Sequence, residues 1–263
     1  MRKHWLALAC GAAMAMPALT QGQETAGKST DDTDTAAERA WAIEVEAAYL
    51  LKSGNSSSES IVGKANAVHE GEKWRQTAKA ETVNTTGEDS DTGDEQRTAE
   101  RYYASYQLDR KFDDNNYLFN VGTYEKDTFS GYQYQASYAI GLGRRFIDTT
   151  AHTLDLEAGP GYRVECLEPE DSYFDCHDTQ ESVIGRFAGK YQWVISENAT
   201  FKQNLISEVG EENTTLRSET SLTSKINDHF AMRLSYLVTR DSEVPDDTHK
   251  TDTETTVSLV YTF

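Results

Sequence analysis

Apolar and polar residues alternate along the chain from residue 41 onward, and this period of two predicts β-strands with one apolar and one polar face. The alternation is clearest over 132–143, where Tyr, Ala, Ile and Leu alternate with Gln, Ser, Ala and Gly. It recurs at 230–240 and again at the end of the sequence, up to Phe263. We predict twelve strands, at 41–52, 59–69, 74–84, 99–108, 117–126, 132–144, 153–164, 181–194, 199–208, 214–225, 230–240 and 251–263.

The connections between these strands alternate between short, turn-like links and longer or acidic ones. The short links lie at 70–73, 113–116, 196–198 and 227–229, and the longer ones at 85–98, 165–180 and 241–250. An even number of long strands joined in this way is typical of a transmembrane β-barrel. We therefore predict an all-β fold: a single antiparallel barrel of about 12 strands in the bacterial outer membrane, with short periplasmic turns and longer acidic outer loops. A secreted β-sandwich or lipocalin-like barrel is the alternative.

Tyrosines and tryptophans cluster near the predicted strand ends, as the aromatic girdle of a membrane barrel requires. They are Trp41, Trp74, Tyr117, Tyr132, Tyr162 and Trp193. Four glycines fall on the polar face of two neighbouring strands, namely Gly141, Gly143, Gly159 and Gly161. Glycine at such positions permits close backbone approach. Alternatively, the free space accommodates Arg144, Arg145 and Arg163.

The chain carries 44 Asp and Glu against 25 Lys and Arg, which gives a formal net charge of −19. Nucleic-acid-binding proteins present basic surfaces to phosphate, so this composition argues against a nucleic-acid partner. After the first two dozen residues, no apolar run approaches the roughly 18 residues that a membrane-spanning helix needs. The composition therefore excludes a helical membrane protein.

The first residues have the layout of a secretory signal peptide. Arg2 and Lys3 precede an apolar run that ends at Ala18, and small and polar residues follow up to Gly22. We predict a signal peptide over 1–22. Cleavage after Ala18 and cleavage after Gly22 are the two alternatives. Residues 23–40 are acidic and lack apolar periodicity, which predicts a flexible segment before the barrel at 41–263.

Two cysteines remain once the signal peptide is removed. Cys166 and Cys176 are separated by ten positions and flank a short polar stretch. In an exported protein this arrangement predicts a disulfide, and a pair of free thiols is the alternative.

The polar faces of the predicted strands carry charges of both signs, which a membrane barrel turns toward its lumen. They are Glu44, Glu46, Arg75, Lys79, Glu81, Asp155, Glu157, Arg163, Arg186, Lys190 and Arg233. The same register adds Lys64, Lys202, Glu208, Arg217, Glu219 and Glu254. Because the two signs nearly balance, these residues either fill a structural barrel with salt bridges or line a narrow, weakly selective channel.

The densest acidic cluster lies in the predicted loop 85–98 and consists of Glu88, Asp89, Asp91, Asp94 and Glu95. Hard cations such as Ca²⁺ bind carboxylate oxygens, so these residues are weak candidates for a metal site, although their spacing matches no EF-hand. A solvated acidic loop is the alternative. We expect no cofactor and no catalytic residue.

Several segments resemble the family of salt-induced outer membrane proteins, also called the domain of unknown function 481 family. The matching segments are 129–136, 141–148 and 154–163, together with Ser53-Gly54-Asn55-Ser56 and Tyr261-Thr262-Phe263. The resemblance spans 41–263 and implies an outer-membrane β-barrel associated with salt response. It also implies that Tyr261 and Phe263 form the C-terminal aromatic signal read by the barrel assembly machinery. It implies no defined reaction.

These observations favour a non-enzymatic barrel, either a small channel or an envelope-stabilising protein linked to salt or osmotic response. Its expected partners are outer-membrane lipid, the assembly machinery and cations at the outer loops. One alternative is a lipase-like outer-membrane hydrolase that uses His177 or His249, although no G-x-S-x-G motif is present. Another is an adhesin that presents Tyr173 and Phe174 between the two cysteines.

Overall fold

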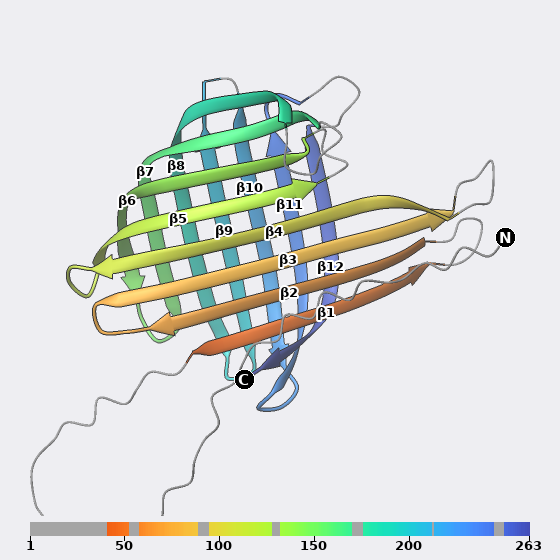
Figure 1. The fold of residues 1–263 in the computed structure, drawn as a ribbon. Coiled ribbons are helices and arrows are strands. Elements are labelled where there is room, and N and C mark those ends of the chain that lie inside the picture. The colour runs from red at the N-terminus through yellow and green to blue at the C-terminus, as the bar shows by residue number, and fades with distance from the viewer. Residues whose placement is uncertain are drawn as a thin grey trace, which may run out of the picture. The chain divides into compact units, whose positions relative to one another are not determined.

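The computed structural model describes residues 41–52, 58–88, 95–127, 132–169, 176–211, 213–244 and 250–263. These residues form twelve strands in one closed antiparallel barrel, in which every strand pairs with its neighbours in sequence and β1 pairs with β12 (Figure 1). The predicted fold class is confirmed. Among the described residues, none forms a helix that is long and apolar enough to cross a membrane. The predicted signal peptide (1–22) and acidic segment (23–40) lie outside the described residues.

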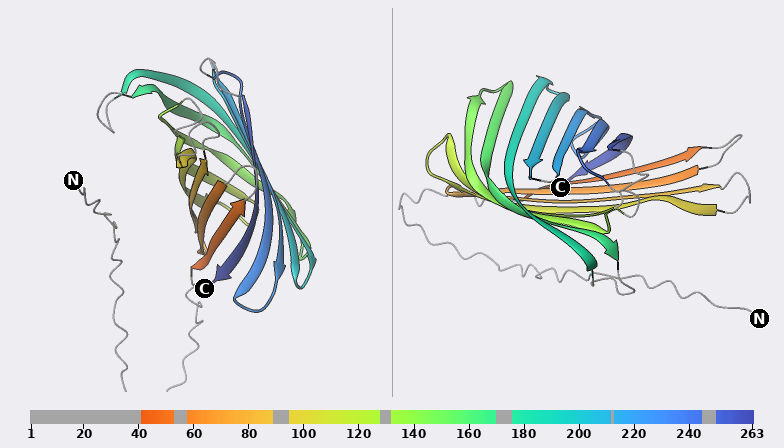
Figure 2. Two further views of the ribbon diagram at one scale, coloured as in Figure 1. Left: turned by 90° about the vertical axis from the view of Figure 1, so that its right-hand side faces the viewer. Right: turned by 90° about the horizontal axis from the view of Figure 1, so that it is seen from above.

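The strands are β1 (Ala42–Lys52), β2 (Ser58–Glu70), β3 (Trp74–Glu88), β4 (Glu95–Lys111), β5 (Asn116–Asp127), β6 (Tyr134–Asp148), β7 (His152–Pro169), β8 (Cys176–Ser196), β9 (Ala199–Val209), β10 (Thr214–Lys225), β11 (Phe230–Asp241) and β12 (Thr251–Thr262). In Figure 1, strands β2 to β5 cross in front of the wall formed by β9 to β12. Figure 2 shows the two walls from the side and from above.

The largest differences from the predicted strand ends occur at two hairpins. β3 and β4 continue through much of the predicted loop 85–98, as far as the pair Glu88–Glu95. β7 and β8 likewise continue into the predicted loop 165–180, as far as the pair Pro169–Cys176. The extension of β3 and β4 is polar on both faces, and that of β7 and β8 has only Cys166, Leu167, Pro169 and Cys176 as apolar residues, without regular alternation. Alternation therefore cannot reveal either extension, whereas backbone pairing between adjacent strands can continue.

A disulfide joins Cys166 on β7 to Cys176 at the start of β8. It therefore joins the loop-side end of a hairpin whose two strands are already paired, from His152–Trp193 at the other end. The cross-link restricts the unfolded chain only over a short loop, so its contribution to stability is modest.

Replacing both Cys166 and Cys176 with serine is expected to lower the free energy of unfolding by about 2 kcal/mol, with the barrel still closed. Urea unfolding of the refolded protein, followed by tryptophan fluorescence, measures this loss. Reductant should produce the same loss in the wild type and none in the double variant. Failure of the double variant to form a barrel would contradict this interpretation.

The barrel has a turn side and a loop side. The turn side holds the connections 71–73, 112–115, 149–151, 197–198 and 226–229, together with the start of β1 and the end of β12, which pair at Glu44–Thr262. In the turn after β4, the backbone N–H groups of Asn115 and Asn116 donate to Asp113 Oδ1 at 2.8 and 2.7 Å. The side-chain amide of Asn116 adds further hydrogen bonds, and together these donors hold the pKa of Asp113 below its ordinary value.

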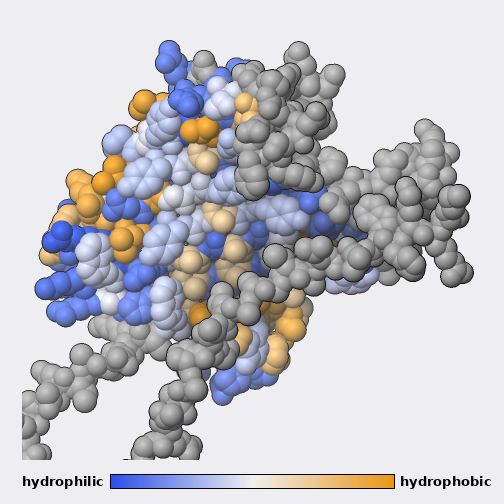
Figure 3. All heavy atoms as spheres, in the orientation of Figure 1, coloured by the Kyte–Doolittle hydropathy of each residue, from blue (hydrophilic) through white to orange (hydrophobic). Residues whose placement is uncertain are grey.

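The outward face of the barrel is apolar and exposed. Large hydrophobic side chains on it include Tyr49, Leu142, Phe146, Val183, Phe187, Val257 and Leu259. In Figure 3 hydrophobic side chains gather at the left of the view, where β5, β6 and β7 curve round the barrel. This inversion, with apolar residues outside and charges inside, is the pattern of a barrel surrounded by lipid.

Four of the six predicted girdle residues lie on the outward face, and two do not. Trp41, Trp74, Tyr162 and Trp193 are exposed. Tyr117 and Tyr132 are instead 5% and 4% exposed, so their assignment to the girdle is wrong. On β5 the inward side is itself apolar, with Tyr117 followed by Phe119 and Val121, and Tyr132 precedes the start of β6.

The predicted inward glycines allow the backbones of β6 and β7 to approach closely. A Cβ atom added at Gly141 would lie 2.2 Å from the carbonyl oxygen of Ala158, and one at Gly159 would lie 2.1 Å from that of Ile140. The space over Gly143 is filled by the Tyr117 ring, 2.2 Å from the position of an added Cβ. The glycines therefore serve close approach, and the expectation that arginines occupy their space is wrong.

Candidate functional site: the charged lumen

The inward positions of the strands carry a dense set of charged side chains. Buried members from the predicted register are Glu46, Lys64, Glu81, Asp155, Glu157, Arg163, Arg186 and Glu208. A closed barrel positions them because every second residue of each strand points inside. Burying such charges is costly unless each is paired and hydrogen-bonded, so the pairing pattern shows how the lumen is organised.

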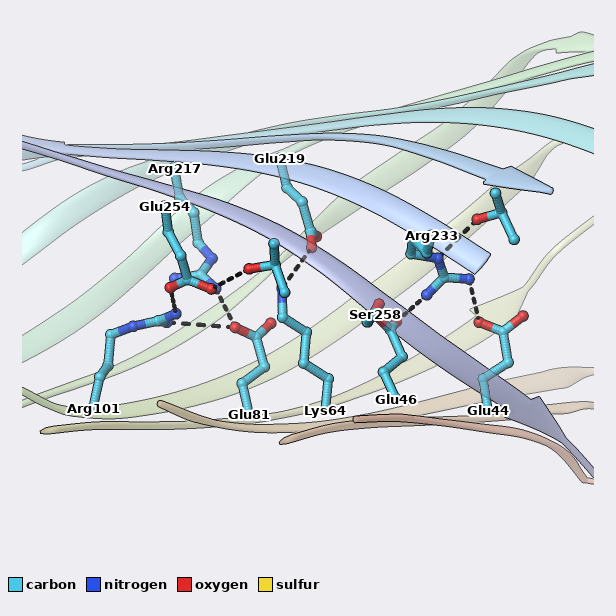
Figure 4. Close-up of polar contacts among 12 residues, drawn as sticks. Glu44, Glu46, Lys64, Glu81, Arg101, Arg217, Glu219, Arg233, Glu254 and Ser258 are labelled. Atoms are coloured by element: carbon cyan, nitrogen blue, oxygen red, sulfur yellow. Dashed lines mark hydrogen bonds and ion pairs between the residues drawn. The ribbon is translucent and has the colours of Figure 1, made fainter. Parts of the chain in front are cut away.

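One group of ion pairs joins opposite walls of the barrel, and we call it the cross-lumen network (Figure 4). It consists of Lys64, Glu81, Arg101, Glu125, Arg217, Glu219 and Glu254. Arg217 Nη2 on β10 lies 2.7 Å from Glu81 Oε2 on β3, and Arg101 Nη2 on β4 lies 2.7 Å from Glu254 Oε2 on β12. These strands are not neighbours in the sheet, so the pairs span the interior.

Arg217 is the centre of this network. Besides Glu81, its Nη1 lies 3.8 Å from Glu125 Oε1, and its guanidinium lies over the Tyr103 ring at 4.4 Å. Arg101 contacts the same two carboxylates, at 3.4 Å from Glu81 and 3.6 Å from Glu125. Two arginines therefore share two glutamates across the lumen, which fixes all four side chains in place.

A second cluster lies nearer the turn side. Arg75 Nε lies 2.6 Å from Asp109 Oδ2, and Asp155 accepts from both Arg75 and Arg145. Glu157 accepts from Lys190 Nζ at 2.6 Å and also from Gln107 and Tyr117. These partners come from β3 to β8, so the cluster again crosses the interior.

Two smaller groups complete the lining. Arg233 on β11 pairs with Glu44 at 2.9 Å and with Glu46 on β1, and Ser258 donates to Glu46 (Figure 4). On the loop side, Arg186 lies 2.7 Å from Glu208, and Arg163 lies 3.3 Å from Glu165. Arg163 is 2% exposed and also donates to the carbonyl oxygen of Asn213 at 2.7 Å.

Cavities lie on both sides of the cross-lumen network. On the loop side a cavity of about 360 Å³ is lined by Arg101 and by five carboxylates, namely Glu125, Asp127, Asp241, Asp252 and Glu254. At the turn side a cavity of about 920 Å³ is lined by residues that include Arg75, Tyr117 and Arg145. The two cavities share no lining residue. Beside Glu125 and Arg217 the free space is a cavity of only about 50 Å³, so the network narrows the lumen there.

The residues from 45 to 263 match a family described as "Protein of unknown function, DUF481". The chain belongs to this family. The family resemblance of the sequence is thereby confirmed. A relative, "Uncharacterized protein YdiY" of Escherichia coli (strain K12), is 31% identical to this DUF481 chain over 231 residues, which cover 88% of the chain and 86% of the relative.

Solved barrels of other kinds are similar to this DUF481 chain. The translocator domain of autotransporter NalP from Neisseria meningitidis has a TM-score of 0.46 at 11% identity, over 88% of this chain and 90% of that one. The NanC porin has a TM-score of 0.45 at 12% identity, over 84% and 98%.

Lys79 and Lys202 occupy inward positions of β3 and β9 and are half-buried, without an ion pair closer than 4.0 Å among the described residues.

Sequence reasoning missed several inward charges, namely Arg101, Asp109, Glu125, Arg145, Glu165 and Asp241. Runs of consecutive charges such as Glu125-Lys126-Asp127 hide the register, and Glu165 and Asp241 fall in segments predicted as loops.

Of the other predicted site residues, the structure describes only some. Phe263 is exposed, and its ring lies 4.6 Å from that of Tyr261. The metal candidates Asp89, Asp91 and Asp94 lie outside the described residues, as do Tyr173, Phe174 and His249. Glu88 and Glu95 pair through their backbones at the end of the β3–β4 hairpin, and their side chains, like that of His177, are not described. No group of ligating side chains suited to a metal ion occurs in the described ranges.

Proposed function

We propose that this DUF481 protein is a non-enzymatic barrel of the bacterial outer membrane that forms a narrow channel, closed at rest by the cross-lumen network. The observation that carries this proposal is the pair of contacts between opposite walls, Arg217 to Glu81 and Arg101 to Glu254. Side chains tied in this way block larger solutes, because moving one of them leaves an unpaired charge inside the barrel.

An outer-membrane location is supported by the exposed apolar face of the barrel and by the aromatic residues on its rim. The exposed ring of Phe263, next to that of Tyr261 after β12, supports recognition by the barrel assembly machinery. The surrounding partner is outer-membrane lipid. The signal peptide over 1–22 is part of the same proposal, because an outer-membrane protein must first be exported.

The loop-side cavity supports a preference for cations. Its five carboxylates face one arginine, and a narrow mouth with excess negative charge concentrates positive ions. A link to salt or osmotic response fits this picture, because dissolved ions weaken the partly exposed pair of Arg101 and Glu254.

Liposome swelling tests the closed state of the lumen. Vesicles that contain the refolded protein are expected to swell no faster in glucose than protein-free vesicles, because the cross-lumen network excludes a solute of that size. A general porin in matched vesicles provides the positive control. In parallel, density-gradient fractions of expressing Gram-negative cells should place the protein with the outer membrane. Glucose entry at the porin rate would overturn the closed lumen.

A further inference from the structure

A groove lies on the outward face of the barrel, and at its base it reaches the inward residues Tyr117 and Glu157. It has a volume of about 760 Å³ and crosses the outer surface of β6 to β9. Its floor is made by small residues, Ala158, Gly189 and Ser207, and bulky side chains such as Leu142 and Phe187 flank it. Leu142 is 65% exposed and Phe187 is 55% exposed, so the walls stand out from the sheet.

Two charged residues line this groove, but Glu157 points into the lumen and accepts from Lys190, which leaves Arg144 as the outward charge. Arg144 lies on the outward face of β6 between Leu142 and Phe146, and its guanidinium lies over the Phe146 ring at 5.6 Å. None of the carboxylates in the described ranges forms an ion pair with Arg144. Asp113 lies close enough for the charge of Arg144 to contribute to its lowered pKa, but the hydrogen bonds that both Asp113 oxygens accept come from Asn115 and Asn116.

An unpaired arginine on a lipid-facing surface is costly unless its guanidinium reaches the headgroup layer. Arg144 is placed to do so. It pairs through its backbone with Asn116, the first residue of β5 after a short turn, so it lies near the turn side. From there the groove extends along Ala158 and Phe187 toward the middle of the barrel.

We propose that this groove binds one phospholipid, with the phosphate at Arg144 and an acyl chain along Ala158 and Gly189. The charge of Arg144 complements the phosphate, and the apolar floor and walls match the chain. The occupant is a membrane lipid because the groove opens on the apolar outer face of the barrel. This inference rests on the proposed membrane location and does not depend on whether the lumen conducts.

Native mass spectrometry tests the site. The protein is refolded into vesicles of phosphatidylethanolamine and phosphatidylglycerol, extracted in mild detergent, and its retained lipids are counted. We expect one tightly held phospholipid in the wild type, and at least a fivefold lower occupancy in Arg144→Gln and in Ala158→Leu. The matched control is Arg110→Gln, because Arg110 lies over the Trp74 ring at 5.8 Å but outside the groove. It should retain the lipid.

Two further arms identify what is bound. Monoolein, which has an acyl chain and no phosphate, and inorganic phosphate alone should both fail to compete with the phospholipid. Equal lipid retention in the wild type and Arg144→Gln, or full competition by either probe, would overturn the proposal. Gel mobility with and without heating checks that each barrel is folded, and Gly189→Leu replaces Ala158→Leu if that variant does not fold.

The result also separates this site from the proposed function. A wild-type barrel that inserts into the vesicles but retains no phospholipid overturns the groove alone. A wild-type chain that does not insert into vesicles overturns both the groove and the membrane location.

Discussion

Replacing Arg217 with glutamine is expected to lower the free energy of unfolding by about 3 kcal/mol, because removing one partner leaves buried charge without compensation. Glu81 would lose its 2.7 Å partner, Glu125 would lose one of its two arginines, and the contact with the Tyr103 ring would disappear. Urea unfolding of the barrel in phospholipid vesicles measures the change.

The control for this variant is Arg240→Gln. Arg240 is exposed on β11 and belongs to no ion pair within the part of the chain that the structure describes, so its replacement should change stability by less than about 0.5 kcal/mol. Adding Glu81→Gln to Arg217→Gln should recover part of the loss, because the unpaired carboxylate is removed. Equal stability of Arg217→Gln and the control would contradict a network that holds the two walls together.

Replacing Gly159 with alanine is expected to prevent folding or to cost about 3 kcal/mol or more, because the methyl group has no space. Its Cβ would lie 2.1 Å from the Ile140 carbonyl oxygen and 2.5 Å from the Gly141 Cα atom. Both are backbone atoms of the adjacent strand, so relief requires β6 and β7 to separate. Heat-dependent gel mobility after refolding measures the folded fraction.

Gly122→Ala provides the matched control for Gly159→Ala. Gly122 also lies within a strand, β5, but a Cβ added there meets no atom within 4 Å. This variant should refold as well as the wild type. If Gly159→Ala refolds equally well, the two strands do not approach as closely as the structure indicates.

The strand pattern could be predicted from the sequence because one face of each barrel strand meets a different solvent from the other. Windows such as 132–143 carry this contrast in nearly every residue pair. The contrast disappears where both faces are polar, as in the extensions of β3 and β4 toward Glu88 and Glu95. It also misleads where the inward face is apolar, as at Phe119, which is fully buried inside the barrel.

The interior charges could be predicted as a set, but their partners could not. Alternation places Glu81 and Arg217 on inward faces, yet the contact between them joins residues 136 positions apart. It depends on how the closed sheet brings β3 and β10 together, and no local pattern encodes this distance. The groove beside Arg144 was hidden for a related reason, because it is formed by small residues on three separate strands.

The most direct test of the closed lumen is the conductance of the refolded wild-type protein in a planar lipid bilayer, recorded at low and at high KCl. We expect currents well below those of the double variant Glu81→Gln/Arg217→Gln, with a preference for K⁺ over Cl⁻ in a salt gradient and a larger open fraction at high salt. Large, stable wild-type currents at low salt, equal to those of the double variant, would contradict closure by the cross-lumen network.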